Sequence, residues 1–134
     1  MRTQLEKANA FRALHERQGA FIIPNPWDAG TARILASMGF EALATTSLGV
    51  ANTLGSATVS LAEIIENCRV ICAATDLPVN ADLENGGAHE PKAAAQAIRL
   101  AAEAGCVGGS IEDMTGDRSK PIYDFNLAVE RVQA

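Results

Sequence analysis

The sequence is short of cysteine, of basic charge and of long apolar runs, and each shortage excludes a class of protein. Its three cysteines, an odd number within apolar segments, fit buried reduced thiols better than a disulfide framework or a zinc knuckle. Eleven Lys and Arg against sixteen Asp and Glu give a net charge of −5, so the chain lacks the basic surface that nucleic acids require. No apolar run reaches the roughly 18 to 20 residues of a membrane span, and the amphipathic N-terminus has no signal-peptide core. We therefore expect a cytoplasmic protein with neither a nucleic acid nor a membrane as its partner.

The composition that remains is that of an ordinary globular domain. The chain has 134 residues, of which 48% are hydrophobic and 20% charged, so a core can form. At roughly 100 to 200 residues per domain, residues 1–134 are one domain or one piece of a larger one.

Short apolar runs alternate with helical patterns along the whole chain, which is typical of an α/β protein with parallel strands. The patterns predict helices over residues 5–14, 28–38, 60–75, 91–104 and 124–132, and strands over residues 21–23, 41–45, 77–81 and 107–111. Residues 46–58, rich in Ser, Thr and Gly and without a clean period, are predicted to form a loop. Right-handed crossovers place the carboxyl ends of parallel strands on one face, where the following loops build sites.

Acidic side chains follow two of the predicted strands at this face. Asp82 and Glu84 follow the third strand and point the same way if that strand continues, and Glu112 follows the fourth. Clusters of carboxylate oxygens suit Mg²⁺ or Mn²⁺, with waters completing the coordination. Solvated loop acids and helix caps are the alternative interpretation of the same residues.

Four motifs, in order along the chain, carry a family resemblance. They are PNPWDA at residues 24–29, ALATTS at 42–47, LPVNADLENG at 77–86 and GGSIED at 108–113. The sequence resembles the isocitrate lyase and phosphoenolpyruvate mutase superfamily, and most closely its phosphonomutase-like branch. The resemblance implies the first half of a (β/α)₈ TIM barrel and Mg²⁺-dependent cleavage or rearrangement of a C–C or C–P bond in a small anionic 2-oxo acid, through a pyruvate enolate.

The resemblance also implies roles for individual residues. Asp82 matches a direct metal ligand, and Glu84 and Glu112 match acids that act on the metal through water. The segment Thr46, Ser47 and Leu48 matches the strand end whose amides and hydroxyl receive the substrate's anionic group. We assign Glu112 and Asp113 as the catalytic acids, with Asp113 orienting groups beside the site; a loop cap is an equally good interpretation of Asp113.

Three departures from the family pattern bear on activity. Residues 55–58 (GSAT) lack the aspartate usual in that loop, and residues 114–121 (MTGDRSKP) replace the Cys-Gly-His loop of the lyase branch, which disfavours isocitrate lyase activity. The chain also ends after four predicted strands, before the later strands that carry a substrate-binding arginine in the family. We expect a fragment of an enzyme, a half barrel that pairs as a homo-oligomer, or a noncatalytic remnant.

Two further interpretations concern single residues and a rival fold. A receiver-like Mg²⁺-binding signalling domain needs paired acids after its first strand, but here Pro24, Asn25 and Pro26 follow it. The histidines, His15 and His89, have no partner at ligand spacing and are interpreted as surface residues.

Overall fold

Three parallel strands form a sheet that helices connect and cover. The computed structural model describes residues 2–134. The elements in chain order are α1 (Gln4–Glu16), α2 (Ala29–Ser37), β1 (Leu43–Ala44), α3 (Ser47–Thr53), α4 (Leu61–Ala74), β2 (Val79–Asp82), α5 (Pro91–Glu103), β3 (Gly108–Ser110) and α6 (Phe125–Gln133). The strand order is β1-β2-β3, with Leu43 paired to Val79 and Asp82 paired to Ser110. The predicted α/β architecture of parallel strand-helix units is confirmed.

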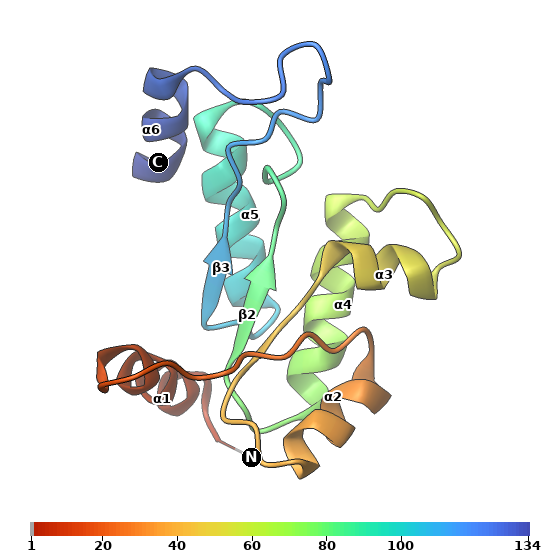
Figure 1. Cartoon of the computed structure of the whole chain (residues 1–134), viewed down its shortest axis with the longest axis vertical. Helices are drawn as coiled ribbons and strands as arrows, with labels where there is room; N and C mark the ends of the chain where they lie inside the picture. The colour runs from red at the N-terminus through yellow and green to blue at the C-terminus, as the bar shows by residue number, and fades with distance from the viewer. Residues whose placement is uncertain (1) are drawn as a thin grey trace.

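The ends of the sheet differ in what surrounds them. Figure 1 shows β2 and β3 side by side, with their carboxyl ends toward the loops that lead to α5 and α6, while α1 lies near the starts of the strands. Helix α4 packs against β2 and against both α2 and α5. In residues 2–134 no helix is long and apolar enough to cross a membrane.

Local sequence signals explain where three of the helices begin. Thr3, Asp28 and Ser60 each accept a hydrogen bond from the backbone three residues later, and each forms a reciprocal capping box. Such caps satisfy backbone donors that the first turn leaves free. The predicted starts of the helices at residues 28 and 60 are therefore confirmed.

The core lies between the sheet and the helices α4 and α5. Its members come from the apolar positions of these elements and are 8% exposed or less: Leu43, Ile64, Ile65, Cys68, Ile71, Cys72, Val79, Ala81, Leu83, Ala97, Ala101, Ala104 and Cys106, with Ala32 from α2. Small alanines on α5 allow that helix to lie close to β2 and β3.

Two sequence predictions about the first half of the chain are wrong. Residues 21–23 form no strand; the segment that follows them makes one backbone hydrogen bond to β1, from the Ala44 N–H to the Pro24 carbonyl at 3.1 Å. Pro24 and Pro26 have no N–H to donate, so a longer ladder cannot form there. Residues 46–58 are not all loop, since Ser47–Thr53 forms α3 with Thr46 as its N-cap.

Helix α3 depends on a glycine that faces a tryptophan. A Cβ placed on Gly49 would lie 2.5 Å from Trp27 Cδ1 and 2.6 Å from Thr46 Cγ2. The Trp27 carbonyl accepts a hydrogen bond from Asn67 Nδ2 at 2.8 Å, which anchors this segment to α4. Trp27 therefore packs against α3, with 46% of its surface still exposed.

We expect Gly49→Ala to lower the free energy of unfolding by about 1 to 3 kcal/mol, because the added methyl group must displace a ring packed against backbone. Gly30→Ala is the matched control, since its Cβ would meet only the Asp28 carboxylate oxygen at 3.3 Å. That variant should stay within about 0.5 kcal/mol of the parent in urea unfolding. Equal stability of Gly49→Ala and the parent would contradict the packing argument.

Candidate active site at the carboxyl ends of the strands

Asp82, the last residue of β2, is held by hydrogen bonds from two neighbouring segments. Its Oδ2 accepts the Ser47 N–H at 2.9 Å, and its Oδ1 accepts the Glu84 N–H at 3.3 Å. Its own N–H donates to Thr45 Oγ1 at 2.9 Å. The carboxylate is therefore fixed in direction at the junction of β1, α3 and β2.

The segment after β1 supplies polar groups that face this carboxylate. Thr45 is 3% exposed, and its N–H donates to the Asn80 carbonyl at 2.9 Å. Thr46 caps α3 through its side chain, and the Ser47 N–H is used by Asp82. Within the described residues, neither the Ser47 hydroxyl nor the Leu48 N–H has a hydrogen-bond partner, and Leu48 is 69% exposed. Both groups are free to bind an anion.

Glu84 and Glu112 come from loops that are joined to each other. The strand β2 ends at Asp82, and Glu84 has a φ of 49°, in the left-handed region that non-glycine residues seldom adopt. The condition under which Asp82 and Glu84 would point the same way, a strand that continues past Asp82, is therefore not met. Its carbonyl instead accepts the Glu112 N–H at 2.7 Å, which ties the loop after β2 to the loop after β3.

The acidic side chains at this end of the sheet repel one another. Partial burial of the carboxyl group is the largest cause that raises the pKa of Glu112. The negative charges of Asp82, Glu84 and Asp113 raise it further. The site therefore concentrates negative charge, which a bound cation would relieve.

The donor set fits a hydrated divalent ion and does not fit an ion held by protein groups alone. Among residues 2–134, no three His, Cys, Asp or Glu side chains lie close enough together to hold a metal ion directly. Mg²⁺ commonly takes one or two carboxylates and keeps several waters. Asp82 keeps acceptor lone pairs beyond its two hydrogen bonds, so it can serve as such a ligand.

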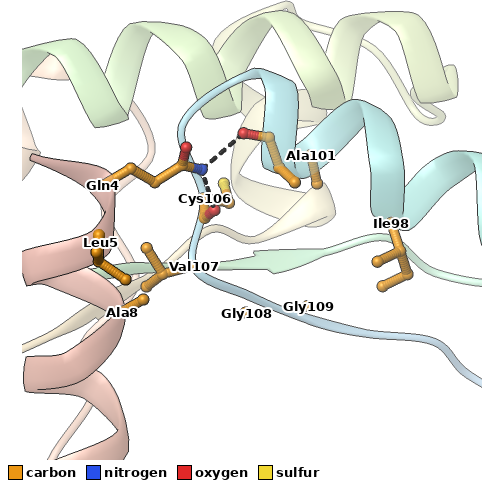
Figure 2. Close-up of a pocket in the computed structure, with 10 residues that line it drawn as sticks. Gln4, Leu5, Ala8, Ile98, Ala101, Cys106, Val107, Gly108 and Gly109 are labelled. Atoms are coloured by element: carbon orange, nitrogen blue, oxygen red, sulfur yellow. Dashed lines mark hydrogen bonds between the residues drawn. The ribbon is translucent and has the colours of Figure 1, made fainter.

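The larger cavities of the structure do not coincide with the acidic cluster; the cavity that reaches Glu112 and Asp113 holds only about 50 Å³. A cavity of about 250 Å³ lies beside the loop after β3 and is lined by His89, Thr115, Asp117, Lys120, Tyr123, Asp124 and Leu127. A larger one, of about 430 Å³, lies between α1, α5 and the edge of β3, and Figure 2 shows that apolar side chains and glycines line it together with Gln4. No acidic residue lines the larger cavity, so its size does not make it the reactive site.

A network that the sequence did not reveal fastens the loop after β2. The guanidinium of Arg131, a residue only 3% exposed, donates to the carbonyls of Asn85, Ala88 and His89 and lies 4.4 Å from the centre of the Tyr123 ring. His89 is exposed, as expected of a surface residue, and its Nδ1 lies 2.9 Å from the Tyr123 hydroxyl, a partner that the sequence did not indicate. In the sequence, Arg131 stands out only as a basic residue in the last turn of a helix. That position is common for arginine and does not indicate a buried network.

Comparisons with known proteins agree with this architecture. The family model described as phosphoenolpyruvate phosphomutase matches residues 11–134. An uncharacterized protein of Mycobacterium tuberculosis is 31% identical over 127 residues, which are 93% of this chain and 47% of that protein.

Solved structures that are similar to this chain include enzymes of the same superfamily. A structure described as a lyase/mutase from Burkholderia cenocepacia J2315 is 56% identical, with a TM-score of 0.94 over 96% of this chain and 47% of that one. A 2,3-dimethylmalate lyase, a PEP mutase/isocitrate lyase superfamily member, is 26% identical, with a TM-score of 0.83 over 99% of this chain and 47% of that one. The chain thus spans about half the length of the relatives that it matches.

We expect Glu112→Gln to raise the free energy of unfolding at pH 7 by about 0.5 kcal/mol, which is the usual size of an interaction between exposed charges. Folding raises the pKa of Glu112, so its ionised form opposes folding at neutral pH. The gain should disappear below the ordinary glutamate pKa of 4.5, where both states are protonated. Urea unfolding at pH 7 and pH 4 measures this.

The control for this prediction is Glu66→Gln, which removes an exposed glutamate 3.7 Å from Arg69. It should give no stabilisation at pH 7. A gain for Glu112→Gln that is equal at both pH values would show that repulsion is not its origin.

Proposed function

Because the chain belongs to the phosphoenolpyruvate phosphomutase family, we propose that it supplies the metal-binding part of an active site that cleaves or rearranges a C–C or C–P bond in a small 2-oxo acid or related dicarboxylate. The product or intermediate would be pyruvate or its enolate. The observation that carries the proposal is the fixed Asp82 carboxylate, held by the Ser47 and Glu84 amides at the carboxyl end of a parallel sheet.

Asp82 would bind Mg²⁺ or Mn²⁺ directly, and Glu84 and Glu112 would act on the ion through water. When bound, such an ion polarises the 2-oxo and carboxylate oxygens and stabilises an enolate as a Lewis acid. The excess negative charge around Glu112 supports a cation there, and the hydrogen bond between the Glu112 N–H and the Glu84 carbonyl holds the two loops in register. Asp113, adjacent to Glu112 and exposed, would orient groups at the edge of the site.

The substrate's anionic group would be received by the segment of Thr46, Ser47 and Leu48. The Ser47 hydroxyl and the Leu48 N–H are the donors that support this role, whereas the Ser47 N–H already serves Asp82. Thr46 contributes by capping α3, which keeps those donors at the end of β1. The segment therefore binds one end of a small anion and leaves the other end to be held elsewhere.

The remaining proposals concern the extent of the domain, its self-association and its location in the cell. Residues 1–134 would form one partial barrel domain, which either belongs to a longer enzyme, pairs as a homo-oligomer or is a noncatalytic remnant. The open edge of β3 supports association, because an unpaired strand edge invites pairing. A cytoplasmic location is supported by three free, buried thiols, which suit a reducing compartment.

We expect the 134-residue chain to bind Mg²⁺ or Mn²⁺ weakly, with the affinity falling at least about tenfold in Asp82→Asn, since even the partners of metal ligands commonly contribute that much. Isothermal titration calorimetry measures this directly. Asp76→Asn is the control, because Asp76 is an exposed aspartate whose Oδ1 accepts only the Arg2 N–H at 2.9 Å. Binding that is unchanged in Asp82→Asn would remove the metal assignment.

We also expect the 134-residue chain alone to form no pyruvate from oxaloacetate, phosphonopyruvate or substituted malates in the presence of Mg²⁺. Only one end of the substrate can be held, and positioning contributes on the order of 7 to 11 kcal/mol in well-oriented reactions. A coupled pyruvate assay measures turnover, with the rate of Asp82→Asn subtracted as background. Light scattering on the same sample should show self-association. A stable monomer whose metal-dependent turnover is lost in Asp82→Asn would refute this prediction.

A further inference from the structure

Three buried thiols lie near one another in the core, and two of them, Cys72 and Cys106, are on the side away from the carboxylates. Cys68 and Cys72 are on α4, and Cys106 lies in the turn between α5 and β3. The sulfur atoms of Cys72 and Cys106 are 3.6 Å apart. Cys68 Sγ is instead 3.8 Å from Thr45 Oγ1, and Cys68 is fully buried. The proposed catalytic role uses none of these thiols.

Cys72 differs from Cys68 because a cavity reaches it. This cavity, of about 250 Å³, is lined by Arg2, Gln4, Lys7, Arg69, Cys72, Ala73, Ala104 and Gly105. Three of the lining residues are cationic and none is acidic; nearby acids are Glu66, 3.7 Å from Arg69, and Asp76, which accepts the Arg2 N–H. Cys72 itself is 8% exposed. A small polar molecule entering this cavity therefore meets one sulfur atom in positively charged surroundings.

The neighbours of Cys72 favour its thiolate. A hydrogen bond from the Cys106 thiol is the largest cause that lowers the pKa of Cys72, and the charge of Lys7 lowers it further. Burial and the charge of Cys68 oppose these two effects. Lys7 is held in place because its Nζ donates to the Thr75 carbonyl at 2.8 Å. The nearby sulfur atoms of Cys68 and Cys72, together with burial, raise the pKa of Cys106, which therefore stays a thiol.

We propose that Cys72 is a site of oxidation by hydroperoxides and that Cys106 resolves the oxidised form into an intramolecular disulfide. The Cys72 thiolate attacks the peroxide, the O–O bond breaks, and sulfenic acid forms with release of water or an alcohol. The Cys106 sulfur then attacks the Cys72 sulfur, the S–O bond breaks, and a second water leaves. Two thiols are oxidised and one hydroperoxide is reduced, so the electrons balance.

The geometry suits the second step. The two sulfur atoms must move about 1.5 Å closer to reach the S–S bond length of roughly 2.05 Å. The turn that carries Cys106 is held to α1, because Gln4 Nε2 donates to the carbonyls of Cys106 and Ala102, as Figure 2 shows. A Cβ on Gly105 would lie 3.1 Å from Cys72 Cβ, so this glycine lets the turn approach α4 closely. The disulfide would link α4 to the start of β3 without touching the carboxylate site.

Peptide mapping after hydrogen peroxide treatment tests the proposal on the 134-residue chain. The protein is treated, denatured, alkylated and cut with trypsin, which places Cys68 in residues 34–69, Cys72 in residues 70–92 and Cys106 in residues 100–118. We expect the number of alkylated cysteines to fall from three to one, with a disulfide joining residues 70–92 to residues 100–118. In Cys106→Ser, which keeps a hydrogen-bond donor beside Cys72 but cannot form a disulfide, dimedone should trap a sulfenic acid on Cys72, and Cys68→Ala should still form the disulfide.

Two results would overturn the proposal. One is a disulfide that contains Cys68 in place of Cys72. The other is three cysteines that remain free for alkylation while Met38 and Met114, which are 66% and 48% exposed, are converted to sulfoxides in the same sample. Methionine oxidation shows that the oxidant was active, so free thiols would then mean that the cationic cavity does not admit peroxide to Cys72.

Discussion

The hydrogen bonds around Asp82 join the parts of the chain on which the candidate site depends. Asp82 ends β2, yet its carboxylate accepts the N–H that begins α3, and its own N–H donates to the hydroxyl that follows β1. A buried or half-buried carboxylate is stable only where such donors compensate for lost water. The start of α3, the end of β1 and the loop after β2 are therefore positioned together, and the loop after β3 joins them through the Glu84 carbonyl.

The sequence predicted the secondary structure correctly where the local pattern and the tertiary contacts favour the same element. The capping boxes at Asp28 and Ser60 and the proline that begins α5 at residue 91 marked three helices close to their observed starts. Prediction from the sequence was wrong where contacts with distant parts of the chain determine the local structure. Residues 21–23 have strand composition but lack a continuous partner ladder, because prolines follow. Helix α3 is short and polar, and it forms because Thr46 caps it and Gly49 admits Trp27, neither of which produces a periodic pattern.

The candidate site, like the fold, was predicted from the sequence only in part. Family motifs identified Asp82, Glu84 and Glu112 as residues at one sheet edge, and the mutual repulsion that raises the pKa of Glu112 agrees with that arrangement. Motifs did not indicate that the Ser47 N–H serves Asp82, nor that Arg131 on α6 holds three carbonyls of the loop after β2. Both facts depend on long-range contacts. Arg131 in particular contacts residues 85–89 through backbone carbonyls and through no acidic side chain, so charge pairing in the sequence could not indicate its position.

The two ends of the sheet carry opposite electrostatics, and this separates the two chemistries proposed here. Carboxylates concentrate negative charge where the strands end, which favours a cation and disfavours a thiolate. Lys7, Arg2 and Arg69 surround the opposite end, where Cys72 opens to its cavity, and positive charge favours the thiolate. Helix α4 spans both ends, since Cys68 lies near Thr45 beneath the carboxylate site and Cys72 lies one turn further on. Because positions four apart lie on one face of a helix and are separated by one turn along its axis, α4 buries Cys68 beneath the carboxylates and places Cys72 nearer the opposite end, where a cavity reaches it.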